Sequence, residues 1–192
     1  MAEAYARFFK PYLAQLITVL AQVATSDMIF RDMNKKIQHL AAQVICLIAE
    51  GAPFMARSMP GNRFVLTALE TTFKLIMDQP DDPEWVLRDD EEDDDMDEDD
   101  GCTVGAHIIL RLTTAIRAKH LITPALRAIE TWTKRPSWRQ RAAALFALST
   151  LGEILPDDTG RQKKLILFIL RFYADPNPHV RYAAIHCIGQ FS

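Results

Sequence analysis

The chain has 192 residues and a formal net charge of −3, with 49% hydrophobic and 24% charged residues. This composition is that of an ordinary globular chain with enough apolar material for a core. Its seven glycines disfavour glycine-rich sandwiches and barrels. The longest apolar runs, such as Leu165 to Leu170, are far shorter than the roughly 20 residues that cross a bilayer, so we expect no membrane partner.

Apolar residues at helical spacing predict four pairs of helices along the chain. Pro136 and Pro176 mark the breaks before the second helices of the last two pairs, because proline is unfavourable in a helix interior but suits the turn and the first helical position. The predicted helices of the first two pairs are 3–23 with 33–50 and 62–77 with 104–117. Those of the last two pairs are 121–133 with 138–153 and 161–174 with 179–191.

The third and fourth pairs repeat each other at an offset of forty residues. Pro136 aligns with Pro176 and Arg141 with Arg181, and two adjacent alanines and two further apolar positions follow in both copies. A period of about 40 to 47 residues built from a helix pair is typical of HEAT and armadillo arrays. The sequence therefore predicts an all-α, right-handed HEAT-repeat solenoid with four antiparallel helix pairs.

The predicted repeats form a single array at about 1–58, 59–117, 118–155 and 156–192, and the second contains an acidic loop at 79–101. The last predicted helix ends with apolar residues and without a polar cap, although solenoids need such caps for solubility. We therefore expect the chain to be a piece of a longer array.

Arg141 and Arg181 fall in the first turn of their predicted helices, where a positive charge is unfavourable for the helix dipole. A base repeated at this position suggests a carboxylate or carbonyl partner in the next repeat. We interpret these two residues as a structural ladder and not as a binding site.

Negative charge is concentrated in one segment. Residues 81–100 contain fourteen acidic residues and one base, Arg88, which gives a local charge of −13. The rest of the chain therefore carries +10, the difference between −3 and −13. The acidic run itself, preceded by Trp85, comprises Asp89, Asp90, Glu91, Glu92, Asp93, Asp94, Asp95, Asp97, Glu98, Asp99 and Asp100.

Three interpretations of the acidic run differ in their physical requirements. A solvated linker needs only charge repulsion. A divalent-metal site needs carboxylates at fixed spacing and a glycine at the sharp turn, and the run has neither. Recognition of a basic protein needs a concentrated negative field that salt would weaken. We favour partner binding and keep the linker as the alternative; Trp85 could dock the loop onto the helices or meet a ligand.

Catalytic and cofactor motifs are missing from the sequence. The five histidines and three cysteines have no metal-ligand spacing, and no nucleophile elbow, phosphate loop or dinucleotide fingerprint occurs. Lysine and arginine are scattered, and the acidic run would repel phosphates, so a nucleic-acid partner is disfavoured. We expect a protein that binds other proteins, without enzymatic activity, metal or cofactor.

Two strings in the last repeats resemble a known family. WRQRAAALFALSTLGE from Trp138 and DPNPHVRYAAIHCIGQFS from Asp175 are similar to consecutive HEAT repeats of importin-beta receptors, closest to the importin-five branch. The stretch PDDPEWVLRDDEEDDDMDEDDGCTVGAHIILRL resembles the repeat in which that family carries a long acidic loop.

The resemblance implies a monomeric receptor that shuttles between cytoplasm and nucleus. Its partners would be the Ran GTPase, cargo proteins with basic localisation signals, and Phe-Gly nucleoporins. Trp85 and residues 89–100 would contact a basic surface on Ran, second helices would line the concave cargo side, and clefts between first helices would take nucleoporin phenylalanines. Because we expect this chain to be a piece without the N-terminal repeats of the family's main Ran contact, it would supply only part of a Ran site. The alternative is a HEAT scaffold or assembly-factor subunit without a transport role.

Overall fold

The computed structural model describes residues 10–26, 31–78, 100–155 and 159–191. All regular structure within these residues is helical, which confirms the predicted all-α class. The longer helices are α2 (Leu13–Ala24), α3 (Arg31–Gly51), α5 (Arg63–Met77), α6 (Gly101–Ile116), α7 (Ala118–Trp132), α8 (Trp138–Gly152), α9 (Thr159–Ile169) and α10 (Pro178–Gly189). The short ones are η1 (Lys10–Tyr12), α4 (Pro53–Ser58), η2 (Pro60–Asn62) and η5 (Leu170–Phe172).

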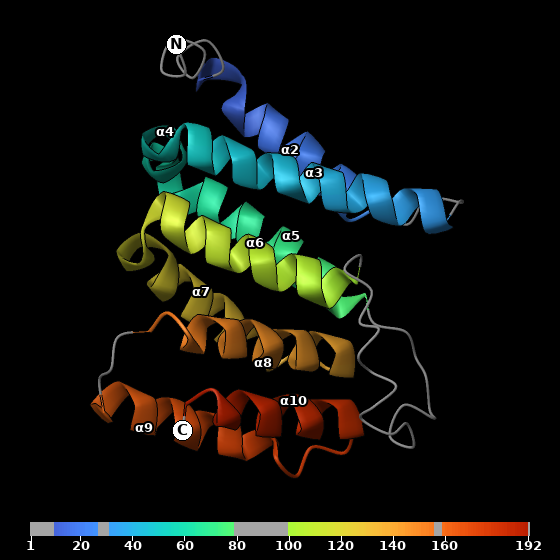
Figure 1. Ribbon diagram of the computed structural model, residues 1–192, viewed down its shortest axis with the longest axis vertical. Helices are drawn as coiled ribbons and strands as arrows, with labels where there is room; N and C mark the ends of the chain where they lie inside the picture. The colour runs from blue at the N-terminus through green and yellow to red at the C-terminus, as the bar shows by residue number, and fades with distance from the viewer. Residues whose placement is uncertain (1–9, 27–30, 79–99, 156–158, 192) are drawn as a thin grey trace.

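The helices form two layers, which Figure 1 shows from the side of the second helices. The first-helix layer contains α2, α5, α7 and α9, and the second-helix layer contains α3, α6, α8 and α10. Each second helix packs on its own first helix and on the second helix of the neighbouring pair. None of the described helices is long and apolar enough to span a membrane.

Helix α8 is the most enclosed element of the stack. It contacts α5, α6, α7 and α10, and it buries residues on several sides. Ala142, Ala143, Ala144 and Ala147 have no exposed surface. Small side chains at these positions let four neighbouring helices approach the α8 backbone closely, so the alanine-rich string holds the third repeat between its neighbours.

The observed helices differ from the predicted ones in several repeats, and α9 ends at Ile169, with η5 following, instead of at residue 174. Helix α6 begins at Gly101 instead of residue 104, and α7 begins at Ala118 instead of residue 121. The predicted helices also left out α4 and the turn η2, in which Gly61 (φ 64°) and Asn62 (φ 55°) are left-handed. One residue, Arg117, joins α6 to α7 with φ 70° and ψ 134°.

Helices α5 and α6 meet closely at two glycines. A Cβ added to Gly105 would lie 2.4 Å from Ile76 Cγ1, and one added to Gly101 would lie 2.6 Å from the Leu75 carbonyl oxygen. Such distances are closer than van der Waals contact allows, so any larger residue would push the two helices apart. Glycine at these positions sets the spacing between the layers in the second repeat.

Gly105→Ala should lower the free energy of unfolding by about 1–3 kcal/mol, because overpacking this contact forces backbone or rotamer shifts. Gly51→Ala is the matched control, since a Cβ there meets nothing within 4 Å and alanine favours the helix. Urea unfolding of both variants measures the difference. Equal stability of the Gly105 and Gly51 variants would contradict the close packing of α5 on α6.

Candidate functional site

The acidic run enters and leaves the described structure beside the second-helix layer. Trp85 and the acidic residues from Asp89 through Asp99 lie outside the described residues. Asp100, the last member of the run, is the N-cap of α6, and its carboxylate accepts a hydrogen bond from the Cys102 N–H at 3.0 Å. Asp100 therefore has a structural role at the start of α6, in addition to its place in the predicted binding set.

Asp78, the last described residue before the run, also lies near a charged partner. Asp78 follows the end of α5, and its carboxylate lies 3.9 Å from the Lys35 Nζ on α3. The chain thus leaves from Asp78 and returns at Asp100 at the same end of the α5–α6 pair (Figure 1). Asp78 follows a first helix and lies beside Lys35 of the second helix α3, and Asp100 caps the second helix α6.

Arg141 and Arg181 make the same set of contacts one repeat apart. The Arg141 Nη1 donates to the carbonyl oxygens of Arg135 (3.2 Å) and Pro136 (2.7 Å) in the turn before α8. The Arg181 Nη1 donates to the carbonyl oxygens of Asp175 (2.8 Å) and Pro176 (3.1 Å) in the turn before α10. Each arginine therefore ties its own helix to the preceding inter-helix turn.

Arg141 also reaches into the next repeat. Its Nε and Nη2 donate to the two carboxylate oxygens of Asp175, both at 2.9 Å. The side chains are 14% and 9% exposed, so this bidentate pair is largely shielded from water. Asp175 Oδ1 further accepts from the Asn177 N–H at 2.9 Å. The partner of Arg141 is thus a carboxylate in the following repeat, and the partners of Arg181 are carbonyls of its own turn.

Asp175 stays ionised because its hydrogen bonds outweigh its burial. Burial alone would raise the pKa of Asp175, but the Arg141 hydrogen bonds, the Asn177 N–H and the charges of Arg141 and Arg181 lower it below the usual Asp value. The carboxylate therefore keeps its charge, and its bond to Arg141, under all near-neutral conditions.

A second bidentate pair joins α3 to α6. The Arg111 Nε and Nη2 donate to the two Glu50 carboxylate oxygens, both at 2.8 Å. Its side chains are more exposed than those of Arg141 and Asp175, at 38% and 36%. The hydrogen bond from Arg111 lowers the pKa of Glu50. No sequence motif indicated this pair, because its partners are 61 residues apart and the acidic run lies between them.

Aromatic side chains gather where α8 meets α10, and we call Trp138, Phe146, His179, Tyr182 and His186 the aromatic cluster. The Trp138 and His179 rings stack at 4.5 Å between centroids. The Phe146 and Tyr182 rings are 6.4 Å apart, and the Tyr182 and His186 rings 6.3 Å apart. Tyr182 is half exposed, so part of the cluster is open to a partner.

The aromatic cluster can attract cations. The Arg139 guanidinium already lies 4.7 Å from the Trp138 ring centroid, within the range of cation–π attraction. His186 Nδ1 and Ser149 Oγ are 3.1 Å apart, so a hydrogen bond orients this ring. Lysine or arginine side chains of a partner could use the exposed ring of Tyr182 in the same way.

The described cleft between first helices is polar. A hollow of about 250 Å³ lies between α2 and α5, with Ala21 among threonine, glutamine and charged side chains. Its lining residues are Thr18, Ala21, Gln22, Thr25, Arg63, Thr67, Glu70, Thr71 and Lys74. A phenylalanine ring binds best between apolar walls, and the polar groups of this hollow make it a poorer candidate for the nucleoporin contact expected between first helices.

The two buried thiols, Cys46 and Cys187, are unreactive at neutral pH. Burial raises the pKa of Cys46 to about 11 and that of Cys187 to about 12. Both therefore stay protonated at neutral pH and act as small apolar side chains. Among the described residues, no group of three histidine, cysteine, aspartate or glutamate side chains could hold a metal ion.

Two family models match the chain. Residues 30–123, which include the acidic run, match the importin repeat, and residues 138–191 match a HEAT-like repeat. Importin subunit beta-3 of Saccharomyces cerevisiae is 24% identical over 197 residues, which cover all of this chain and 17% of that relative. The HEAT-like match lies on the strings that suggested this repeat type.

Solved structures of Kap121p share the fold. The structure of Kap121p bound to RanGTP has a TM-score of 0.80 at 23% identity and covers 97% of this chain and 18% of its own. The structure of Kap121p bound to Nup53p has a TM-score of 0.78 at 24% identity, with 95% and 17% covered. These matches confirm the HEAT-solenoid fold, and the chain spans less than a fifth of the length of each of these relatives.

Asp175→Asn should lower the free energy of unfolding by about 3 kcal/mol, because the shielded Arg141 guanidinium loses its charged partner. Glu50→Gln removes the same kind of bidentate contact from a more exposed pair, and it should cost about 1 kcal/mol or less. Chemical unfolding at pH 7 measures both. An equal decrease in the free energy of unfolding in the Glu50 and Asp175 variants would contradict the role assigned to burial.

The contribution of Asp175 should also depend on pH. Its folded pKa lies below the unfolded value of about 3.9, so its stabilisation is complete above that value and is lost as the pH falls through the folded pKa. The stability difference between the parent chain and Asp175→Asn should therefore shrink below about pH 4. A difference that stays constant down to pH 2 would show that Asp175 gains nothing from ionisation.

Proposed function

We propose that this chain, a HEAT-repeat array of the importin-beta family, is a segment of a nuclear transport receptor that binds protein partners. The observation that carries the proposal is the importin-repeat match over residues 30–123, which covers the acidic run. Kap121p has been solved with RanGTP and with Nup53p, so an array of this fold can accommodate such partners. The partners of this segment are then Ran, cargo with basic localisation signals and Phe-Gly nucleoporins.

The wider role follows from the same premise. The segment is one unbroken array of four helix pairs, with repeats at about 1–58, 59–117, 118–155 and 156–192, inside a longer solenoid. The receptor acts as a monomer of the importin-five branch and shuttles between cytoplasm and nucleus. No catalytic step is needed, because binding and release of partners suffice for carriage.

The acidic run recognises basic protein surface. Trp85 and residues 89–100 bring most of a local charge of −13 to one loop, and concentrated charge raises both the association rate and the selectivity for basic partners. Both described ends of the loop are next to second helices: Asp78, which follows α5, lies 3.9 Å from Lys35 of α3, and Asp100 caps α6. A basic segment held by the run would therefore continue along the second-helix layer.

The aromatic cluster lies on the second-helix layer, along which we expect the basic segment to continue. Basic localisation signals are rich in lysine and arginine, whose charged ends are attracted to aromatic faces. Tyr182 is 50% exposed, and its neighbour Ile185 on α10 is 66% exposed. Together they offer a cation an aromatic face and offer the side-chain stem an apolar contact.

Nucleoporin phenylalanines need a different surface, because the α2–α5 cleft is polar. In the first-helix layer, α9 exposes Leu167 (57%) and, just beyond it in η5, Leu170 (44%). These two leucines are three residues apart and therefore share a helix face. We assign the Phe-Gly contact of this segment to that face.

Neutralising part of the acidic run should weaken binding of Ran-GTP and of a basic localisation peptide. The variant changes Asp93, Asp94 and Asp95 to Asn and keeps Asp100, because Asp100 caps α6. We expect lower affinity at low salt and a smaller difference between low and moderate salt, since fewer charges attract the partner. Fluorescence anisotropy with labelled peptide, and competition by Ran-GTP, measure both.

The matched control for this variant changes three exposed acids elsewhere, Glu70, Glu130 and Glu153, to Gln. The net charge then changes equally, but the run is intact. If both variants lost the same affinity, the change in net charge alone would explain the weaker binding. No binding by the parent chain would leave the scaffold alternative, with the run as a solvated linker.

Tyr182→Ser should weaken binding of the basic peptide about two- to five-fold, the equivalent of about 0.5–1 kcal/mol of cation–π attraction. Because the Tyr182 side chain is half exposed, thermal stability should change little. Tyr173→Ser is the control, since Tyr173 is 66% exposed and lies outside the aromatic cluster. Unchanged peptide affinity in the Tyr182 variant would remove the cluster from the cargo surface.

A further inference from the structure

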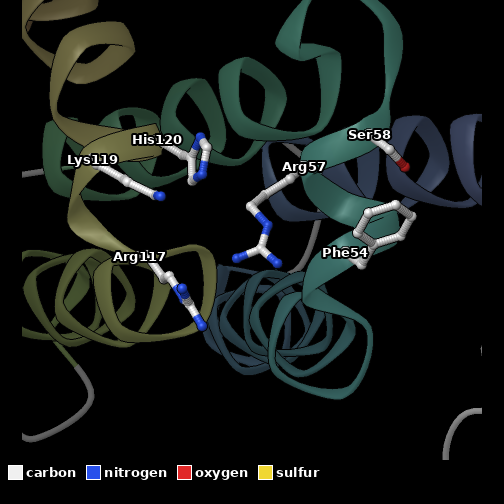
Figure 2. Close-up of a pocket in the computed structure, with 6 residues that line it drawn as sticks. All are labelled: Phe54, Arg57, Ser58, Arg117, Lys119 and His120. Carbon is white, nitrogen blue, oxygen red and sulfur yellow. The ribbon is translucent and has the colours of Figure 1, made fainter.

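A second charged feature lies at the opposite end of α6 from the acidic run. A hollow of about 380 Å³ opens between α4 and the first turn of α7, and we call it the basic hollow. It is lined by Phe54, Arg57, Ser58, Arg117, Lys119 and His120 (Figure 2). Three side chains with permanent positive charge and one histidine face this space, and no aspartate or glutamate lines it.

The cations of the basic hollow have no counter-charge within the described residues. Arg111 and Arg141 each hold a carboxylate in a bidentate pair. In contrast, Arg57, Arg117 and Lys119 form no ion pair in the described part of the chain. Like charges gathered without an anion repel one another, and an anionic ligand would relieve that repulsion.

Arg57 is held in place for such a ligand. Its side chain is partly buried, and its Nη1 donates to the carbonyl oxygen of Ile116, the last residue of α6, at 3.5 Å. A guanidinium has five N–H donors in a fixed fork, so most of the Arg57 donors remain available. Figure 2 shows the group extending from α4 toward the α6–α7 junction, where Arg117 lies.

Arg117 stands where the fold alone would favour glycine. It is the single residue between α6 and α7, with φ 70° and ψ 134°. A side chain at positive φ is strained for any residue other than glycine. An arginine at this position therefore does not stabilise the helix connection. It does place a positive charge in the basic hollow, on a residue fixed between two helices.

The hollow also has an apolar wall. Phe54 is 74% exposed, the highest exposure among the large hydrophobic side chains of the described residues. A simple phosphate would leave this ring unused, whereas a peptide that combines carboxylates with an apolar side chain would cover it. A nucleic-acid backbone needs an extended basic groove, and the three cations here form a compact group.

We propose that the basic hollow binds an acidic linear segment of a partner protein, with carboxylates against Arg57, Arg117 and Lys119 and an apolar side chain against Phe54. This site is separate from the acidic run, because the 16-residue helix α6 lies between Asp100 and Arg117, a distance of about 24 Å. It also takes the opposite class of partner. One repeat of this segment thus carries one site for basic and one for acidic protein segments.

The test uses the full chain and a fluorescein-labelled, end-blocked peptide Glu-Glu-Leu-Glu-Glu-Phe as the probe in an anisotropy titration at low salt. The variant combines Arg117→Gly with Lys119→Gln. Glycine suits φ 70°, so this variant should keep or raise the thermal stability of the parent chain. We expect about a ten-fold loss of peptide affinity, the equivalent of two charge-assisted contacts at an exposed site.

The control variant changes Lys163 and Lys164 on α9 to Gln, which removes the same net charge from exposed positions outside the hollow. Its peptide affinity should equal that of the parent chain. Phe54→Ala should lower the affinity of the parent chain for the labelled peptide, whereas its affinity for a peptide of glutamates alone should stay the same.

Equal peptide affinity in the parent and in the Arg117–Lys119 variant would overturn the proposal. So would equal loss in the α9 control, because the effect would then be one of net charge. Inorganic phosphate or a deoxythymidine decamer that competes as well as the peptide, with the same dependence on Arg117 and Lys119, would show a general anion site and overturn the assignment to an acidic protein segment.

Discussion

No helix pair of this chain buries its apolar surface by itself, and every pair therefore depends on its neighbours. Helix α8 shows the constraint most clearly, because its buried alanines and leucines contact α5, α6, α7 and α10 together. The hydrophobic effect is proportional to the apolar area removed from water, so the core exists only when successive pairs stack. Stacking in turn fixes the two layers and the surface that each presents.

Polar contacts then hold the stacked pairs in register. The Arg141–Asp175 pair joins α8 to the turn before α10, and Glu50–Arg111 joins α3 to α6. Only the Glu50–Arg111 pair links two second helices directly, whereas Arg141–Asp175 links a second helix to the turn of the next repeat. Charge-assisted bidentate bonds impose geometry as well as energy. The second-helix layer is consequently ordered at its repeat junctions, which suits a surface that presents charged and aromatic groups to a partner.

The ends of α6 carry opposite charge. Asp100 and the acidic run precede the helix, and Arg117 and Lys119 of the basic hollow follow it. The cations of the basic hollow form no ion pair within the described residues, in contrast to the paired arginines of the second-helix layer. Partners of opposite sign can thus be held by one repeat without competing for the same surface.

Much of the fold was predictable because the signals are local and periodic. Helical spacing and the forty-residue offset located the last two pairs to within a few residues, and the repeated arginine indicated a polar contact between helix and turn. The helices on either side of the second repeat were harder to predict. Helix α7 starts without a break signal after Arg117, and the short helix α4 is too brief for periodicity to reveal.

The site was harder to predict than the fold because its residues are distant in sequence. Phe54 and Arg57 meet Lys119 only after the helices stack, and in the sequence each cation is one of many scattered bases. The partner of Arg141 could not be predicted either, because its aspartate does not recur in the repeat. The position forty residues before Asp175 is occupied by Arg135. Trp85 and residues 89–99 remain predictions, because they lie outside the described residues.

In our proposal, basic partners bind the acidic run and continue along the second-helix layer. Hydrogen–deuterium exchange of the full chain, with and without saturating basic localisation peptide, tests it most directly. We expect slower exchange at the start of α6 and in the first turns of α8 and α10, with α2, α5 and α7 unchanged. Protection confined to the first-helix layer, or no protection at saturation, would contradict it.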